Sequence, residues 1–212
     1  MSLTLTEKSQ GTFELAPAGT SVARCYRLVD MGTHKITWQG KEKTARKLLI
    51  SFELLDDDNR MSDGRPFSVS KRFTASLNEK AALRAFLESW RGKAYTAADL
   101  EGVDLRKVLG AYCLLGIVHA EKDGSTYANI SSVLPLPKAM PKPAPVNDIL
   151  VFDFDDPQAD VVYATLSESL QKQIADSPEW KARTAKPAPA EKPADDGAQP
   201  SGFQSMDDDI PW

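Results

Sequence analysis

Basic and aromatic side chains alternate along the first 75 residues of this 212-residue chain. A cationic side chain attracts a phosphate, and the face of an aromatic ring stacks on a base. Their combination on one surface is typical of a site for single-stranded nucleic acid, where each stacked base contributes roughly 1–3 kcal/mol. The candidate contacts are Arg24, Tyr26, Arg27, Lys35, Trp38, Lys41, Lys43, Arg46, Lys47, Lys71, Arg72 and Phe73, with Tyr112 further along the chain.

Trp38 is the best candidate for stacking, because it lies in a basic stretch between Lys35 and Lys41. The alternative for Trp38 is a plug that closes one end of a barrel. Phe73 shares one face of its predicted strand with Phe67 and is equally suited to a hydrophobic core. The two candidate tyrosines, Tyr26 and Tyr112, alternate with small or basic residues. Burial in the core is the alternative for each of them.

The charge of the chain is divided along its length. The net charge of the whole chain is -4, but residues 1–145 carry +5, residues 146–185 carry -5 and residues 186–212 carry -4. A basic body suggests a polyanionic partner. The acidic rear could bind a basic partner or shield the basic surface of the body itself.

No pattern of catalytic residues is present, so we expect no enzymatic activity. The sequence lacks the G-x-x-x-x-G-K-[ST], G-x-S-x-G and H-E-x-x-H motifs. The run Asp56–Asp58 lacks the spacing of a calcium loop, and the acidic segment 152–156 fits a packed acidic segment better than a metal site. A metal nuclease built from clustered Asp residues is the enzymatic alternative, but these runs lie in predicted turns and tails. We expect no metal and no cofactor.

The hydrophobic pattern predicts a mainly β domain. Alternation places Leu48, Ile50, Phe52 and Leu54 on one face of a strand, and helical spacing begins after residue 75. Strand, strand, strand, helix, strand, strand is the order of the OB-fold, a five-stranded barrel that binds oligonucleotides. The predicted strands are 21–30, 46–58, 66–75, 107–121 and 126–136, with the helix at 76–90 and a basic connector at 31–45.

Three segments of different composition follow from this pattern. Residues 1–137 form the predicted barrel domain, and residues 138–183 combine a Pro-rich spacer with one amphipathic helix. We expect this helix to dock on the barrel or on a second subunit. Residues 184–212 contain few large apolar groups, so we expect a disordered linker that ends in an acidic tip.

The last six residues, DDDIPW, have the chemistry of a peptide ligand. Their carboxylates can pair with basic residues of a partner, and the two apolar side chains can fill a pocket while proline limits the free-state entropy. A solubilising acidic tail would explain the carboxylates but not a terminal indole. The predicted partner-binding tip is Asp207, Asp208, Asp209, Ile210, Pro211 and Trp212.

The tip closely resembles that of bacterial single-stranded DNA-binding proteins, which ends Asp-Asp-Asp-Ile-Pro-Phe. Here Trp212 replaces the final phenylalanine. The body resembles the OB-fold single-stranded DNA-binding proteins of tailed bacteriophages over most of residues 20–183. The similar stretches are ARCYRLVDMGTHKITWQGKEK, LLISFELL, YANISSVLPLP and LQKQIADSPEW.

This resemblance implies a protein that coats single-stranded DNA during phage replication or recombination. Its tip would recruit host or phage replication and repair proteins that read such tips. A recombination mediator or strand-annealing protein is the alternative, because it needs the same barrel. No membrane-spanning run or signal peptide is visible, so we expect a cytoplasmic protein, in the host cytoplasm if phage-encoded. The sequence leaves open whether the chain forms a homo-oligomer.

Overall fold

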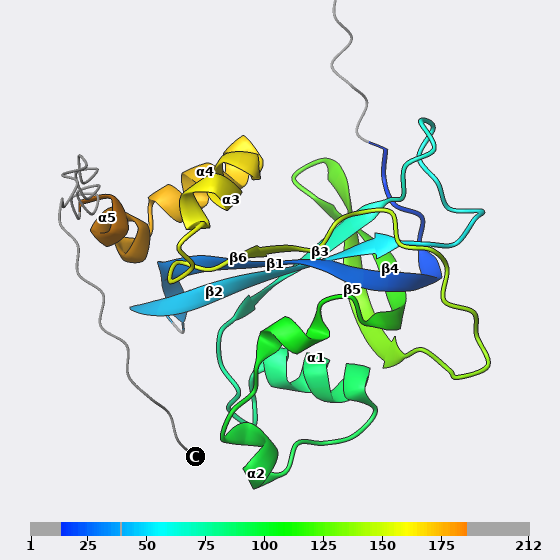
Figure 1. Cartoon of the computed structure of the whole chain (residues 1–212), viewed down its shortest axis with the longest axis horizontal. Coiled ribbons are helices and arrows are strands. Elements are labelled where there is room, and N and C mark those ends of the chain that lie inside the picture. The colour runs from blue at the N-terminus through cyan, green and yellow to red at the C-terminus, as the bar shows by residue number, and fades with distance from the viewer. Residues whose placement is uncertain (1–13, 39, 186–212) are drawn as a thin grey trace, which may run out of the picture.

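The protein is described by a computed structural model that covers residues 14–38 and 40–185. Within these residues the chain forms an open six-stranded sheet, antiparallel except at β6, with short helices on both faces (Figure 1). The strands are β1 (Gly19–Trp38), β2 (Lys41–Leu54), β3 (Ser68–Thr74), β4 (Tyr112–Lys122), β5 (Ser125–Pro135) and β6 (Leu150–Phe152). The helices are α1 (Ala82–Arg91), α2 (Ala97–Leu100), the 3-10 helix η1 (Leu105–Val108), α3 (Ala159–Thr165), α4 (Glu168–Ala175) and α5 (Pro178–Ala185).

The strand order is β3-β2-β1-β4-β5, and β6 adds to β1 in parallel. The mainly β class is therefore confirmed, and helices lie between β3 and β4 as predicted. Closure into a barrel is not confirmed, because no ladder joins β3 to β5 among the described residues. A side chain bridges these two strands instead, since Lys71 Nζ donates a hydrogen bond to the Ile130 carbonyl at 2.8 Å.

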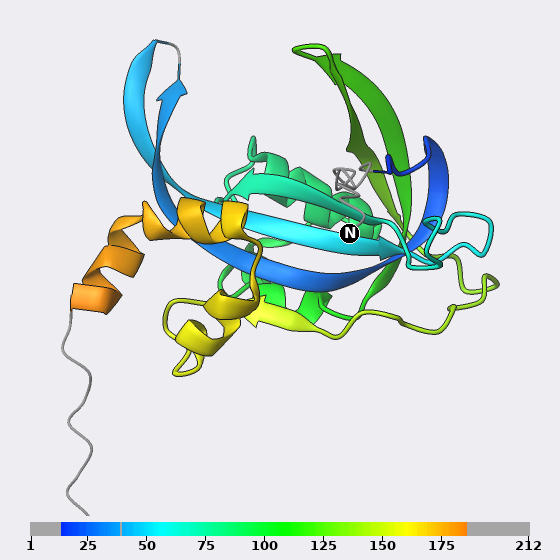
Figure 2. The ribbon, with the colours of Figure 1, turned by 90° about the horizontal axis from the view of Figure 1, so that it is seen from above.

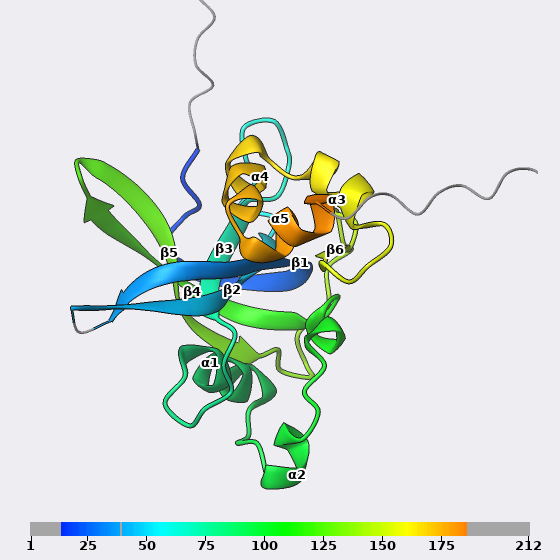
Figure 3. The same cartoon turned by 90° about the vertical axis from the view of Figure 1, so that its left-hand side faces the viewer.

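Two hydrophobic cores lie on opposite faces of β1 and β2. The first lies between the sheet and α1, where Phe52 packs against Trp90 with ring centroids 5.2 Å apart. The second lies under α3, α4 and α5, and Leu49 of β2 faces it. Figure 3 shows the sheet between α1 and the C-terminal helices. Strand β2 is apolar on both faces because each face is covered.

The predicted connector at 31–45 is wrong. Strand β1 continues to Trp38 and β2 begins at Lys41, so most of this segment forms a hairpin arm. Gly32 does not break the strand, because it lies at a register shift of β1, where a bulge absorbs its positive φ of 76°. A second arm is formed by β4 and β5, and Figure 2 shows both arms projecting on the same side of the sheet.

The C-terminal extension, residues 150–185, also differs from the prediction. It contains one strand and three short helices in place of one amphipathic helix, and Val161, a predicted apolar-face residue, is 68% exposed. Pro178 begins α5, which is the favoured helix position for proline. The extension packs on the sheet of its own chain, with Leu170 and Ile174 buried against β1 and β2.

A close contact fixes the extension to the base of the hairpin arm that β1 and β2 form. The backbone N–H of Thr33 donates to Glu179 Oε2 at 2.9 Å, and the Thr33 hydroxyl donates to the same carboxylate. Burial acts to raise the pKa of Glu179, but the hydrogen bonds from Thr33 outweigh it and hold that pKa below its usual value. A Cβ built on Gly32 would lie 2.5 Å from Ser177 Cβ, so only glycine fits here.

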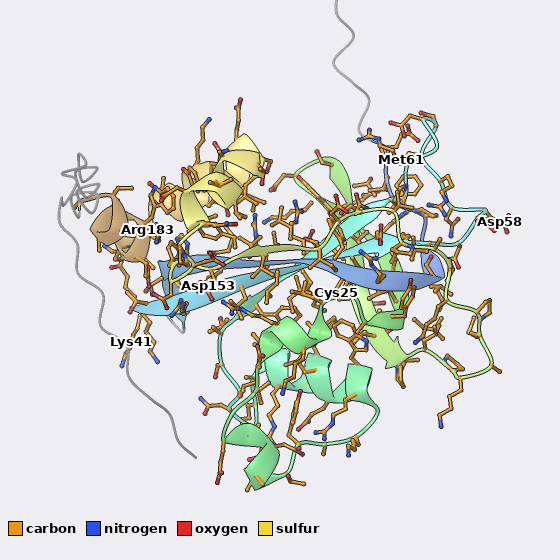
Figure 4. All side chains as sticks on the ribbon, viewed as in Figure 1. Cys25, Lys41, Asp58, Met61, Asp153 and Arg183 are labelled. Carbon is orange, nitrogen blue, oxygen red and sulfur yellow. The ribbon has the colours of Figure 1, made fainter. Side chains whose placement is uncertain are left out.

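The two cysteines, Cys25 and Cys113, are buried and free. Cys25 lies between the sheet and α1 (Figure 4). Burial raises the pKa of Cys25 to about 12 and also raises the pKa of Cys113.

Among the helices of the described ranges, none has the length and apolar character that crossing a membrane requires.

We predict that Gly32→Ala destabilises the protein more than Gly64→Ala. Both glycines have positive φ, 76° and 82°, so each substitution carries the left-handed strain of about 1–2 kcal/mol. Only Gly32→Ala also drives a methyl group into Ser177, because a Cβ at Gly64 meets nothing within 4 Å. Urea unfolding should show an extra loss of about 1–3 kcal/mol for Gly32→Ala. Equal losses would contradict tight docking of the extension.

Candidate nucleic-acid interface

Strand β3 lies between two arms that extend beyond the main sheet. Within the described residues, β1 and β2 pair only with each other over 32–38 and 41–46, and we call this the β1–β2 arm. The β4–β5 arm covers 118–129, where β4 and β5 have lost their other neighbours. Each arm begins at a glycine next to a register shift, Gly32 in β1 and Gly116 in β4. The bulges bend the arms away from the sheet.

Two hollows open on either side of Arg72 in β3. Hollow A has a volume of about 950 Å³ and lies between the β1–β2 arm, β3 and the start of α1. Hollow B has a volume of about 970 Å³ and lies between β3, the β4–β5 arm and the extension. Because Arg72 lines both, the two hollows adjoin at this residue, and we call them together the groove across β3.

The groove is basic. Hollow A is lined by Lys43, Lys47, Arg72 and Lys80, and no described residue lining it is acidic. Hollow B adds Arg27 and Arg65, and among its described lining residues Glu14 is the one acid. The Glu14 carboxylate accepts hydrogen bonds from the backbone and hydroxyl of Ser62. The groove therefore gathers several cations and one described acid, although Arg65 is paired with Asp63 at 2.6 Å.

The outer face of β3 forms the floor of the groove, as its alternation predicts. Ser68, Ser70 and Arg72 are exposed, whereas Val69 and Phe73 are buried in the core below. Ser70 Oγ donates to Ser51 Oγ of β2 at 2.8 Å. Such a floor of small hydroxyl side chains leaves room for a chain to cross the strand.

Aromatic faces are available at one end of the groove. Tyr26 is half-buried in hollow B, with its hydroxyl 2.7 Å from Ser68 Oγ and the Arg27 guanidinium 5.5 Å from its ring centroid. Tyr127 of the β4–β5 arm also lines hollow B and is 49% exposed. A base stacked on either ring would lie beside the cations of the groove.

The structure brings only part of the predicted set into the groove. The predicted residues that line it are Tyr26, Arg27, Lys43, Lys47, Arg72 and Phe73. Phe73 lines hollow A but is only 3% exposed and packs on Phe86, with ring centroids 4.9 Å apart. Its main contribution is thus to the core.

Arg24 is buried and cannot meet a ligand in this conformation. It is 7% exposed, and its Nε lies 2.9 Å from Oε1 of the fully buried Glu53, without hydrogen-bond geometry. Arg24 also donates to the carbonyl of Asn147 at 2.6 Å. Glu53 accepts from the backbone and side-chain amides of Asn147, at 2.8 Å each. The pair therefore fastens the Pro-rich spacer to the sheet.

Two further predicted contacts make structural interactions. Lys71 points inward, over the rings of Phe73 and Phe86, and desolvation lowers its pKa. Tyr112 donates its hydroxyl to the Pro143 carbonyl at 2.7 Å and does not line either hollow. Both side chains hold together parts of the chain that are distant in sequence.

The remaining predicted residues lie on or near the β1–β2 arm. Lys35 and Lys41 are exposed but outside both hollows, and Figure 4 shows Lys41 at the far end of the arm. Arg46 donates to Asp30 Oδ2 at 2.8 Å, and this hydrogen bond raises the pKa of Arg46. Trp38 ends β1, but its side chain is outside what the structure describes. The predicted tip, Asp207–Trp212, also lies outside the described residues.

Several residues that line the groove were not predicted from the sequence. Lys80 and Arg65 belong to loops, where a single cation gives no periodic signal. Ser167, Ser169 and Gln173 come from the extension, and nothing in their pattern indicates that they face β3. Within residues 14–38 and 40–185, no group of three or more His, Cys, Asp or Glu side chains is placed to hold a metal ion.

Comparison of the sequence with models of known protein families gave no match, and a search of curated proteins found no similar sequence.

We predict that Arg24→Met destabilises the protein by about 3–5 kcal/mol, because it leaves the Glu53 carboxylate buried without a cation. Arg27→Met is the matched control, since Arg27 is half-buried on the same strand and donates only to a hydroxyl, Ser51 Oγ, at 3.1 Å. Its cost should be below about 1.5 kcal/mol. Urea unfolding measures both variants. Similar costs would show that Arg24 does not have the structural role described above.

Proposed function

We propose that this chain is a sequence-nonspecific single-stranded DNA-binding protein that protects single strands in phage DNA replication or recombination. The observation that carries the proposal is the basic groove across β3, in which hollows A and B meet at Arg72. A groove that tracks the backbone with cations and offers aromatic faces is what sequence-neutral binding of a single strand requires.

The proposal includes an OB-type architecture for the sheet. Support comes from the strand order β3-β2-β1-β4-β5, the helix between β3 and β4, and the contact between Lys71 and Ile130 across the seam. In OB-folds the ligand surface lies on strands 2 and 3, between the loops that join strands 1–2 and 4–5. Here those loops are replaced by the two arms, and the groove lies between them (Figure 2).

The binding test is a titration of the full chain against fluorescent oligo-dT and a duplex of the same length. We expect single-strand selectivity and an affinity that falls with salt. If about four phosphates are neutralised, the slope of log K against log salt is about -3. Affinity that is independent of salt, or equal affinity for duplex, would contradict the proposal.

Variants locate the site within the same titration. Arg72→Ala and Lys43→Ala should each weaken oligo-dT binding and reduce the salt slope by about 0.7, the value for one lost phosphate contact. Lys93→Ala is the control, because Lys93 is exposed after α1 and lines neither hollow. A Lys93→Ala effect as large as that of Arg72→Ala would exclude the groove as the site.

The tip is proposed to bind replication or repair proteins that read bacterial tips of this kind. Deleting residues 207–212 should leave or improve DNA affinity, because three carboxylates are removed. Binding to a tip-reading bacterial protein should be lost on deletion and on Trp212→Ala, but kept in Trp212→Phe. Fluorescence anisotropy measures both interactions. Loss of DNA binding on deletion would instead make the tip part of the DNA site.

A further inference from the structure

Helix α4 of the extension runs alongside the groove. Its apolar residues Leu170 and Ile174 are buried in the second core against β1 and β2, which fixes the rotation of the helix. The next helix, α5, is held to β1 by the contact of Glu179 with Thr33. Figure 1 shows α4 above the sheet, on the face opposite α1.

One helix lines both hollows. Ser167, Ser169 and Leu170 line hollow B, and Gln173 lines hollow A. Among the described residues of the extension, these are the ones that line the groove. Helix α4 therefore spans the same junction that Arg72 spans from β3, and the groove has a wall made by the extension.

The acidic residues of the extension lie away from the groove. Residues 150–185 carry a net charge of -4, with seven acidic and three basic residues. None of these carboxylates is among the described residues that line either hollow, although Glu168 lies between Ser167 and Ser169 in sequence. The extension thus presents hydroxyl and amide groups to the groove and keeps its negative charge elsewhere.

Neutral polar groups are suited to a polyanion that the cations already attract. Serine hydroxyls can donate hydrogen bonds to phosphate oxygens, and such contacts are frequent in complexes with nucleic acids. The Gln173 amide donates to the carbonyl and hydroxyl of Ser169, so it orients this serine toward the groove. A carboxylate in the same place would instead repel the strand and pair with the groove cations.

We infer that α4 is the second wall of the single-stranded DNA site, with Ser169 donating a hydrogen bond to the sugar-phosphate backbone and with Gln173 holding Ser169 in place, because its side-chain amide donates to the Ser169 carbonyl at 3.0 Å. This inference rests on the proposed function. On this inference the C-terminal extension contacts the DNA together with the sheet.

The test compares two isosteric substitutions that add the same charge to the extension. Gln173→Glu places a carboxylate in hollow A, whereas Gln158→Glu places one at the exposed start of α3, outside both hollows. In the oligo-dT titration of the full chain, Gln173→Glu should weaken binding about 5-fold or more, and Gln158→Glu less than about 2-fold. Urea unfolding of both variants checks that the fold is kept.

A second measurement detects contact without relying on charge. The photoreactive residue p-benzoylphenylalanine at position 169 should cross-link to oligo-dT, and the same residue at position 158 should not. If the unmodified protein binds no oligo-dT, the proposed function fails. If it binds and Arg72→Ala weakens it, while both glutamine variants behave alike and position 169 does not cross-link, the inference about α4 alone is overturned.

Discussion

Strand β1 pairs with three neighbours, and the remainder of the structure depends on how it does so. It pairs with β2 over most of its length, with β4 over Gly19–Arg24 and with β6 over Arg27–Val29. Two register shifts, at Cys25/Arg27 and Asp30/Gly32, bend the strand between these contacts. Without the bends one straight strand could not leave the main sheet, receive the extension and form an arm.

Helices cover much of both faces of β1 and β2, whereas the outer face of β3 stays exposed. The second core occupies the surface that Leu49 would otherwise expose. Burial on both sides also requires that polar groups in the sheet be paired. Arg24 and Glu53, which face each other in the β1–β2 register, form such a pair. The covered part of the sheet thus combines two hydrophobic cores with paired polar groups.

Strands and helices were predicted correctly where neighbouring residues in the sequence carry the pattern. The alternation of Ser68, Ser70 and Arg72 against Phe67, Val69 and Phe73 correctly separated the outer face of β3 from the core. Helix α1 was recognised from its spacing, although it begins six residues later than predicted and ends one residue later, at Arg91. Gly92 caps it in the left-handed conformation.

The features that were not predicted depend on contacts between residues that are distant in the sequence. Arg24 resembles a surface cation until the register places it opposite Glu53, which is 29 positions away. Gly32 reads as a break in a strand, and only its contact with Ser177 shows why glycine is needed. The side chains of α4 that line the groove follow from how Leu170 and Ile174 dock, which a single-sequence pattern does not reveal. The open edge between β3 and β5 likewise depends on contacts between distant strands, which local alternation does not describe.

The burial of both cysteines has a practical consequence for spectroscopy. A thiol reacts with maleimide dyes as its thiolate, and burial disfavours that form in Cys25 and Cys113 while also blocking access. A single cysteine introduced on the surface of either arm would therefore be labelled selectively near neutral pH, with both native thiols left in place. The fold thus accepts a site-specific fluorophore on either arm.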